Sequence, residues 1–303
     1  MSSTVNEIWE AMSKVAGNLA EQTGRAVVAV DASYRVAASG VYWKPGIVVT
    51  ASHLVRRAEE VSVILPNGGS VRGPVRGRDS TTDLAVVRID DSSALVSLSH
   101  ASSTNLGELV LAVGRSRRGE LSASTGIMAR TGGPWQTWRG GQISRLLRPD
   151  VRLYPGQSGS ALVNGRGELI GINSSVLARE SVITLPVETI ERVVNELSER
   201  GHIAQPYLGI AVQEVPLPQE WRSGADEEPG LLVVHVAPDT PAKQSGVNLG
   251  DVIVRADSQA VQNVRQFHRL LAQKRIGEIL KLELIRGGSI IETTVTLGDR
   301  PQH

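Results

Sequence analysis

The sequence contains no cysteine, so neither a disulfide framework nor a cysteine nucleophile is available to the protein. This absence leaves the redox compartment undecided. Aromatic residues make up only 3% of the chain, so Val, Leu, Ile and Ala must supply most of the core. No apolar run approaches the roughly 20 residues of a membrane-spanning helix. The net charge of +1 gives no overall field that would favour nucleic acid or a membrane surface as a partner.

The N-terminal segment does not have the pattern of a targeting signal. Residues 1–19 contain Glu7 and Glu10 and lack the basic start of a signal peptide. We therefore expect a cytoplasmic protein for the sequence as given, or a periplasmic or otherwise extracytoplasmic one if an export leader was removed. Apolar residues at spacings of three and four predict an amphipathic helix within residues 1–24: Ile8, Met12, Val15 and Leu19. That face packs either on its own domain or on another copy of the chain.

Short Val- and Ile-rich runs separated by turn residues fill the chain from Ala26 to about Val187. Strands that follow one another without helices between them indicate an antiparallel sandwich or barrel. Asn164-Gly165 lies between two such runs and predicts a tight hairpin. The sequence is therefore mostly β in this region.

A helix is predicted from Val187 to Arg200, with Gly201 after its end. Pro206 follows, and the remaining residues predict a small α+β domain with a helix at Val264–Ala272. We therefore expect three parts: an N-terminal helix over 1–24, a first domain over 25–202 and a second domain over 203–303.

Gly156-Gln157-Ser158-Gly159-Ser160 can carry a serine nucleophile. Glycines on both sides of Ser158 permit a tight turn whose N–H groups point at a developing oxyanion. We expect the segment Gly156, Gln157 and Ser158 to form that oxyanion hole, through the N–H groups of Gly156 and Ser158. Ser160 excludes the G-x-S-x-G nucleophile elbow of α/β-hydrolases. Alone, this pentapeptide is also typical of an ordinary turn.

Two further segments supply candidate partners for that serine. His53 lies at the end of an apolar strand, and Asp83 opens another apolar strand. Each alone has an ordinary reading, as a surface histidine or a turn aspartate. Their order along the chain, His53, Asp83 and Ser158, is that of chymotrypsin and differs from the orders of subtilisins and α/β-hydrolases. This order agrees with the mostly β pattern, so together they predict a catalytic triad.

These segments resemble the HtrA family of trypsin-fold serine proteases over nearly the whole chain. The resemblance is carried by Thr50-Ala-Ser-His53, by Thr82-Asp83-Leu-Ala-Val-Val and by the stretch from Asp150 to Asn173. It implies a chymotrypsin-like double barrel of two six-stranded antiparallel β-barrels. It also implies a serine endopeptidase of unfolded or damaged proteins, and a homotrimer assembled through the N-terminal region.

Some positions depart from the family pattern. Gln157 and Ser160 replace the usual Asn and Gly beside the nucleophile, and Gly114-Arg-Ser-Arg-Arg-Gly119 replaces an Asn-Pro-Phe-Gly stretch. Because such regions shape the specificity pocket and the switching of the family's enzymes, specificity and regulation are the properties most open to change. We expect an uncharged pocket and cleavage after small or medium aliphatic residues, with a wall from Leu153, Tyr154 and the segment Ile172, Asn173, Ser174 and Ser175.

The second domain resembles a PDZ domain. Its carboxylate-binding loop would be Tyr207-Leu208-Gly209-Ile210, whose N–H groups would bind the C-terminal carboxylate of a peptide. Phe267 and Leu271 would wall the pocket, with Leu271 the more core-like of the two. Binding there is expected to act on the protease through the loop between Arg130 and Arg148.

The sequence predicts no metal site and no cofactor, because no metal-ligand spacing is present. Two alternatives to the enzyme remain open at this stage. One is a peptide-binding scaffold whose protease domain is inactive, and the other is a chaperone-like holdase that captures unfolded chains.

Overall fold

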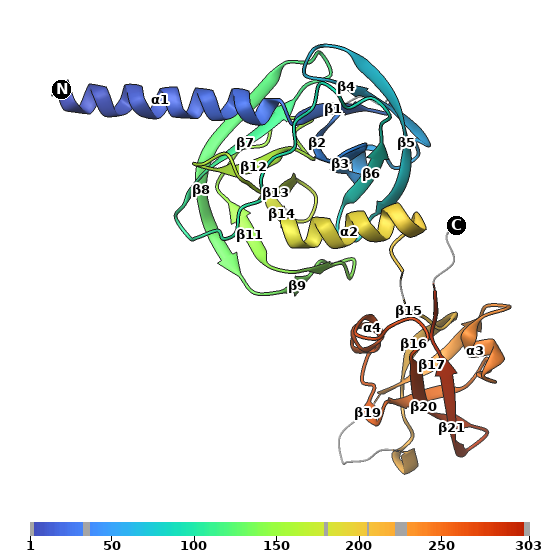
Figure 1. Cartoon of the computed structure of the whole chain (residues 1–303). Helices are drawn as coiled ribbons and strands as arrows, with labels where there is room; N and C mark the ends of the chain where they lie inside the picture. The colour runs from blue at the N-terminus through green and yellow to red at the C-terminus, as the bar shows by residue number, and fades with distance from the viewer. Residues whose placement is uncertain (1–2, 33–36, 179–180, 205, 222–228, 300–303) are drawn as a thin grey trace. The chain divides into compact units, whose positions relative to one another are not determined.

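We analysed a computed structural model that describes residues 3–32, 37–178, 181–204, 206–221 and 229–299. The chain forms two compact units, and the boundary between them along the sequence lies between Ile203 and Ala204 (Figure 1). Within the described residues, no helix is both long and apolar enough to span a membrane.

The N-terminal unit contains two closed six-stranded barrels. In the first barrel the strands are ordered β1-β2-β3-β6-β5-β4, and every pairing is antiparallel. Its strands are β1 (Val27–Asp31), β2 (Ala38–Lys44), β3 (Ile47–Ala51), β4 (Glu60–Ile64), β5 (Ser70–Asp79) and β6 (Leu84–Arg88). A short 3-10 helix, η1 (Ser52–Leu54), follows β3.

The second barrel has the order β11-β14-β13-β12-β7-β8. Its strands are β7 (Leu109–Arg115), β8 (Leu121–Gly132), β11 (Leu146–Pro149), β12 (Ala161–Asn164), β13 (Leu169–Ser174) and β14 (Ile183–Pro186). The predicted hairpin at Asn164-Gly165 is confirmed, because it joins the paired strands β12 and β13. A small hairpin of β9 (Trp135–Gln136) and β10 (Gln142–Ile143) lies between β8 and β11.

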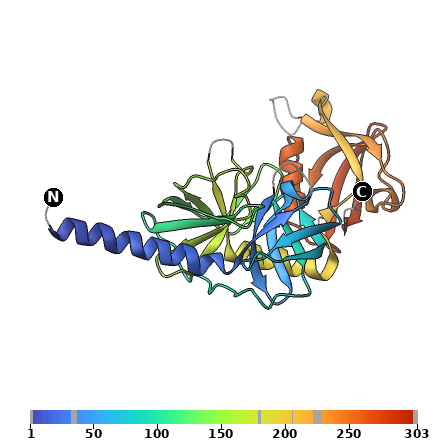
Figure 2. The same cartoon turned by 90° about the horizontal axis from the view of Figure 1, so that it is seen from above.

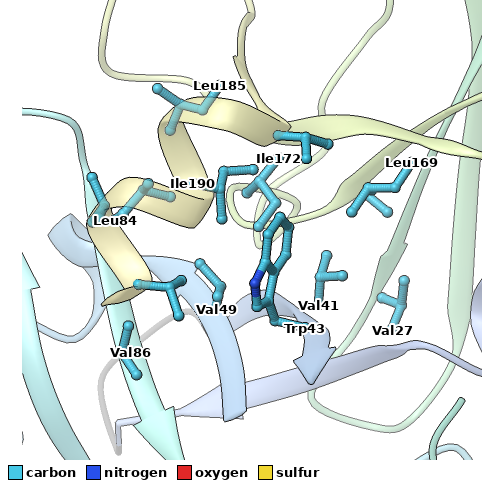
Figure 3. Close-up of a cluster of buried hydrophobic side chains, with 14 of the residues drawn as sticks. Val27, Val41, Trp43, Val49, Leu84, Val86, Leu169, Ile172, Leu185 and Ile190 are labelled. Carbon is cyan, nitrogen blue, oxygen red and sulfur yellow. The ribbon is translucent and has the colours of Figure 1, made fainter. Parts of the chain in front are cut away.

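One apolar cluster joins the two barrels and helix α2 (Val187–Arg200). Figure 3 shows Trp43 of the first barrel among Ile172 of the second barrel and Ile190 of α2. The predicted α2 is confirmed at both ends, and its apolar face is buried: Ile190, Val193, Val194 and Leu197. Gly201 ends α2 in a left-handed conformation with φ 77°, which a residue with a Cβ rarely adopts. This cluster fixes the two barrels against each other.

The C-terminal unit is a six-stranded sheet with two α-helices, α3 (Pro241–Gln244) and α4 (Val264–Ala272). Its order is β16-β17-β18-β20-β21, with β19 paired to β18, and β16 is an edge strand. The sheet strands are β16 (Ile210–Pro216), β17 (Pro229–Val236), β18 (Val252–Ala256), β19 (Gln259–Ala260), β20 (Ile279–Arg286) and β21 (Ser289–Thr296). A separate pair joins β15 (Pro206–Tyr207) to β22 (Gly298–Asp299), and the 3-10 helix η2 (Gln219–Trp221) follows β16.

Helix α1 (Ser3–Gly24) projects from the N-terminal unit in both views (Figures 1 and 2). Only its last turns contact the barrels, where Leu19 and Ala20 pack against the apolar cluster. The predicted apolar face is otherwise exposed: Ile8 by 56%, Met12 by 47% and Val15 by 52%. The interpretation that this face packs on its own domain therefore holds for Leu19 alone.

Arg115 ties the end of α1 to the barrels. Its guanidinium donates hydrogen bonds to the carbonyl oxygens of Gly24 (2.7 Å), Val27 (2.7 Å) and Gly119 (2.6 Å). Arg115 is only 5% exposed, and burial lowers the pKa of its guanidinium. No acidic side chain is among these partners, so carbonyl dipoles take the place of water around the charge.

Replacement of Arg115 by methionine should destabilise the N-terminal unit by about 3 kcal/mol, because three carbonyl groups lose their buried donor. The matched control is Arg117→Met. Arg117 pairs with Asp31 at the surface, and such pairs contribute less than about 1 kcal/mol. Urea unfolding followed by tryptophan fluorescence measures both variants. Equal losses for the two would contradict this role of Arg115.

Candidate active site

His53 and Asp83 lie in direct contact. His53 is in η1, directly after β3, and Asp83 is the residue before β6, the neighbour of β3 in the barrel. The His53 Nδ1 atom lies 2.9 Å from both carboxylate oxygens of Asp83. The backbone N–H of His53 also donates a hydrogen bond to Asp83 Oδ1. Because a carboxylate only accepts, Nδ1 carries the proton and Nε2 is left as the base.

Asp83 is 3% exposed, and its carboxylate is held by a residue of the second barrel. Ser174, at the end of β13, donates its hydroxyl to Asp83 Oδ2 at 2.6 Å. Asp83 also has a positive φ of 61°, an uncommon conformation for a residue other than glycine. The sequence analysis placed Ser174 in the pocket wall and missed its bond to Asp83, since nothing near it in the chain indicates a partner so far away in sequence.

The loop that carries Ser158 is fixed to both barrels. The Ser39 N–H donates to the Ser158 carbonyl oxygen at 3.0 Å, and the Ser39 hydroxyl donates to the Gly156 carbonyl oxygen at 2.9 Å. Gly159 has φ 89°, and a Cβ there would lie 2.0 Å from the Ser39 carbonyl oxygen. Only glycine therefore fits after Ser158.

Two backbone N–H groups of this loop are available for an oxyanion. Among the hydrogen bonds of the described residues, none uses the N–H of Gly156 or of Ser158. The prediction for Gln157 needs correction, because its N–H donates to the Tyr154 carbonyl oxygen at 3.0 Å. Its buried side chain accepts from the Tyr154 N–H and donates to Ser122. The Gln157 side chain therefore fixes the loop that carries Ser158 through its bonds to Tyr154 and Ser122.

The Ser158 hydroxyl is engaged with a neighbouring serine in this structure. Ser158 Oγ lies 2.7 Å from Ser175 Oγ and accepts a 3.3 Å hydrogen bond from the Ser175 N–H. Within the described part of the chain, no hydrogen bond joins Ser158 to His53. Ser158 is 4% exposed. Either hydroxyl can donate in this pair, and when Ser158 is the donor its proton is not available to His53.

A cavity of about 580 Å³ is lined in part by Ser175, whose hydroxyl contacts Ser158. Leu153, predicted as a pocket residue, lines it together with Ser175, Val151 and Val182. The cavity also contains charged groups, from Arg130, Arg148 and Asp150. The expectation of an uncharged pocket is therefore wrong for this cavity.

Three other predicted pocket residues lie elsewhere. Ile172 is 1% exposed and belongs to the cluster between the barrels. Asn173 is fully buried, and its side chain bonds to Ser160 and Thr184. Tyr154 is 46% exposed and lies beneath the guanidinium of Arg152. Every residue of β13 is buried, and the Ile172 side chain packs in the cluster between the barrels. Ile172 is therefore not exposed to the site, although it is close in sequence to Ser174 and Ser175.

The predicted peptide-binding loop of the C-terminal unit leads into the edge strand β16. Gly209 has φ 88°, and within the described residues no acceptor is bonded to the N–H of Leu208 or Gly209. Helix α4 lies alongside β16, where the Val264 N–H donates to the Glu214 side chain. A free strand edge with unpaired N–H groups at its start is suited to add a peptide strand and hold its carboxylate.

The roles of the two α4 residues are reversed from the prediction. Phe267 is 2% exposed and belongs to the core of the unit, while Leu271 is partly buried at its edge. Tyr207 and Ile210 are also partly buried, which leaves their side chains in reach of a ligand. In the described part of the protein, no three His, Asp or Glu side chains gather as a metal site would require.

Comparison with known proteins identifies both units. The family model described as a trypsin-like peptidase domain matches residues 38–172, and the PDZ domain model matches residues 206–297. A serine protease from Lactobacillus helveticus, named Do-like HtrA, is 31% identical over 285 residues. The match covers 88% of this chain and 69% of that protein.

Solved structures have the same architecture. The crystal structure of a serine endoprotease from Yersinia pestis matches with a TM-score of 0.69 and 27% identity, over 94% of this chain and 98% of that one. The HtrA-type protease AlgW with a tripeptide matches with a TM-score of 0.65 and 26% identity, over 95% and 98% of the two chains.

Proposed function

The chain belongs to the HtrA family of serine endopeptidases with one PDZ domain, and we propose that His53, Asp83 and Ser158 are its catalytic triad. The observation that carries this proposal is the buried Asp83 carboxylate on His53 Nδ1, which leaves Nε2 as the base. A scaffold without activity and a holdase are not favoured, because neither requires this arrangement.

In the proposed mechanism, Ser158 Oγ attacks the scissile carbonyl carbon while His53 Nε2 takes the hydroxyl proton. The N–H groups of Gly156 and Ser158 hold the oxyanion of the tetrahedral intermediate, and Asp83 stabilises the imidazolium. The C–N bond then breaks, and His53 returns the proton to the leaving amine. Water, activated by His53, hydrolyses the acyl-enzyme and regenerates Ser158. The substrates are unfolded or damaged proteins, as the family resemblance implies.

The engaged Ser158 hydroxyl supports a resting state of low activity. Before attack, Ser158 must exchange its hydrogen bond to Ser175 for one to His53. Ser174 is a positioning residue in this proposal, because its hydroxyl fixes Asp83 from the second barrel.

A pair of neighbouring variants tests these assignments. Ser158→Ala should abolish casein cleavage and fluorophosphonate labelling, since removal of the nucleophile costs roughly a million-fold in rate in subtilisin. Ser175→Ala should instead raise the rate about 2- to 10-fold, as one neutral hydrogen bond no longer competes for the Ser158 proton. Casein cleavage by Ser158→Ala at the wild-type rate would reject the triad, and a slower Ser175→Ala would reject the competition.

We propose that the PDZ domain regulates the protease through the β9–β10 hairpin, which lies in the predicted segment between Arg130 and Arg148. The hairpin contacts the turn that precedes Asp83: Thr137 Oγ1 donates to the Thr81 carbonyl oxygen at 2.8 Å, and Arg139 donates to the Ser80 carbonyl oxygen at 3.1 Å. Asp79 holds the same turn through the Thr81 and Thr82 hydroxyls. A movement of this hairpin would therefore shift the turn that precedes Asp83 and change the position of its carboxylate.

Peptides with an aliphatic C-terminal residue should raise casein cleavage by the full chain, whereas the same peptides with an amidated C-terminus should not. The free carboxylate is needed because it accepts from the N–H groups of Leu208 and Gly209. Thr137→Val should weaken this activation without reducing peptide affinity. A chain that ends at Ile203 should not respond to peptide. If it matches the peptide-saturated full chain, and peptide leaves the full chain unchanged, the PDZ domain acts only as a tether.

We further propose that the protein is a homotrimer in which α1 contributes to the contact between copies. The exposed apolar face of α1 supports this, because such a face is stable in water when it packs on a partner.

The substitutions Ile8→Asp and Met12→Asp should lower the molecular mass measured by light scattering at micromolar concentration, because a charge in an apolar contact is costly. Glu10→Ala, on the same exposed helix, is the control and should leave the mass unchanged. A monomer mass for the wild-type chain would count against the trimer, as would a trimer that survives both aspartate substitutions.

A further inference from the structure

The cavity lined by Ser175 is also lined by two arginines that are paired across neighbouring strands. Arg130 on β8 and Arg148 on β11 are direct partners in the antiparallel register. Residues paired in this way extend their side chains from the same face of the sheet. Both line the cavity, and so does Ser175, whose hydroxyl contacts Ser158. Two guanidinium groups therefore belong to the same cavity as the neighbour of the nucleophile.

This arrangement is unfavourable unless an anion is present. Like charges directly opposite each other destabilise a strand pair. Within the described residues, no carboxylate lies within 4.0 Å of the guanidinium of Arg130 or Arg148, although nine ion pairs of other Arg and Lys side chains are found. Asp150 lines the cavity without forming an ion pair to either arginine. The cavity is thus cationic by one unit, from two arginines and one aspartate.

The rest of the lining is suited to a polypeptide side chain. Val151, Leu153 and Val182 give the cavity an apolar wall. An acidic side chain has an apolar stem of one or two methylenes and a planar carboxylate, which guanidinium groups bind with paired hydrogen bonds. The apolar wall of the cavity matches the methylene stem of such a side chain, and the two arginines match its carboxylate.

We propose that this cavity binds an aspartate or glutamate side chain of the substrate, within a few residues of the scissile bond, between Arg130 and Arg148. The proposal rests on the proposed function, in which Ser158 is the nucleophile. It adds to the predicted preference for an aliphatic residue at the cleaved bond, because the acidic side chain belongs to a different residue of the same substrate.

Binding is measured first, with the inactive full chain Ser158→Ala and fluorescent peptides. One Glu is moved through successive positions, and each peptide is matched by its Gln counterpart. All peptides are amidated, so that the PDZ loop gains no C-terminal carboxylate. The best Glu peptide should bind about tenfold more tightly than its Gln counterpart, and this ratio should fall as salt screens the charges.

Three substitutions added to Ser158→Ala identify the site. Arg130→Gln with Arg148→Gln should remove the preference for Glu, and Asp150→Asn should increase it, because the single acid of the cavity is lost. Arg118→Gln is the control, an exposed arginine outside the cavity, and should keep the preference. Opposite effects at Asp150 and the arginines would not arise from misfolding.

Equal binding of Glu and Gln peptides would overturn the proposal, and so would a Glu preference that survives the double arginine substitution. An all-Gln peptide with a free C-terminus tests the other source of a carboxylate. Arginine-dependent binding of that peptide alone would reject the side-chain assignment. Cleavage of the same peptides by the wild-type chain is a separate readout, since its absence counts against Ser158 as nucleophile and leaves the binding result intact.

Discussion

The geometry of the proposed catalytic site depends on hydrogen bonds that cross between the two barrels. Ser39 of the first barrel holds the carbonyl groups of Gly156 and Ser158, and Ser174 of the second barrel holds Asp83 of the first. Each barrel thus fixes a part of the site that belongs to the other. Because hydrogen bonds tolerate only a few tenths of an ångström, the barrels must keep one relative position for both bonds to form. The apolar cluster around Trp43 provides that position.

The same arrangement limits where activity can be controlled. His53 and the buried Asp83 are held in one hydrogen-bonded network, whereas the Ser158 hydroxyl bonds to Ser175 and, in the proposed mechanism, must turn to His53. Control through that step requires only a rotation of one side chain or a small loop movement. Such a change is less costly than separation of the barrels, which would expose the apolar cluster to water.

Patterns with a short range in the sequence predicted the structure well. The periodicity of α2 and the glycine after it gave both helix ends, because helix ends depend on nearby residues. The segments around His53 and Asp83 also predicted a contact that the structure contains. Here the order of residues and the strand pattern carried information about neighbouring strands of one barrel.

Side-chain direction was harder to predict. Ile172 and Asn173 belong to a strand buried on both faces, so the usual alternation of inward and outward residues is absent. Phe267 and Leu271 lie one helical turn apart, and a small rotation of α4 decides which of them enters the core. Ser39, Ser174 and Arg115 act on residues far away in the chain. No local pattern marks such residues, because their partners are set by the tertiary fold.

Helix α1 has two segments that differ in their contact with the barrels, and Arg115 holds only the C-terminal one. In the last turn of the helix, the Gly24 carbonyl oxygen accepts a hydrogen bond from the buried Arg115, so this turn is part of the folded barrel unit. The preceding turns, up to about Val15, contact solvent along their apolar face. A limited cut in those turns would therefore release a peptide and leave the barrel pair with its own helix cap.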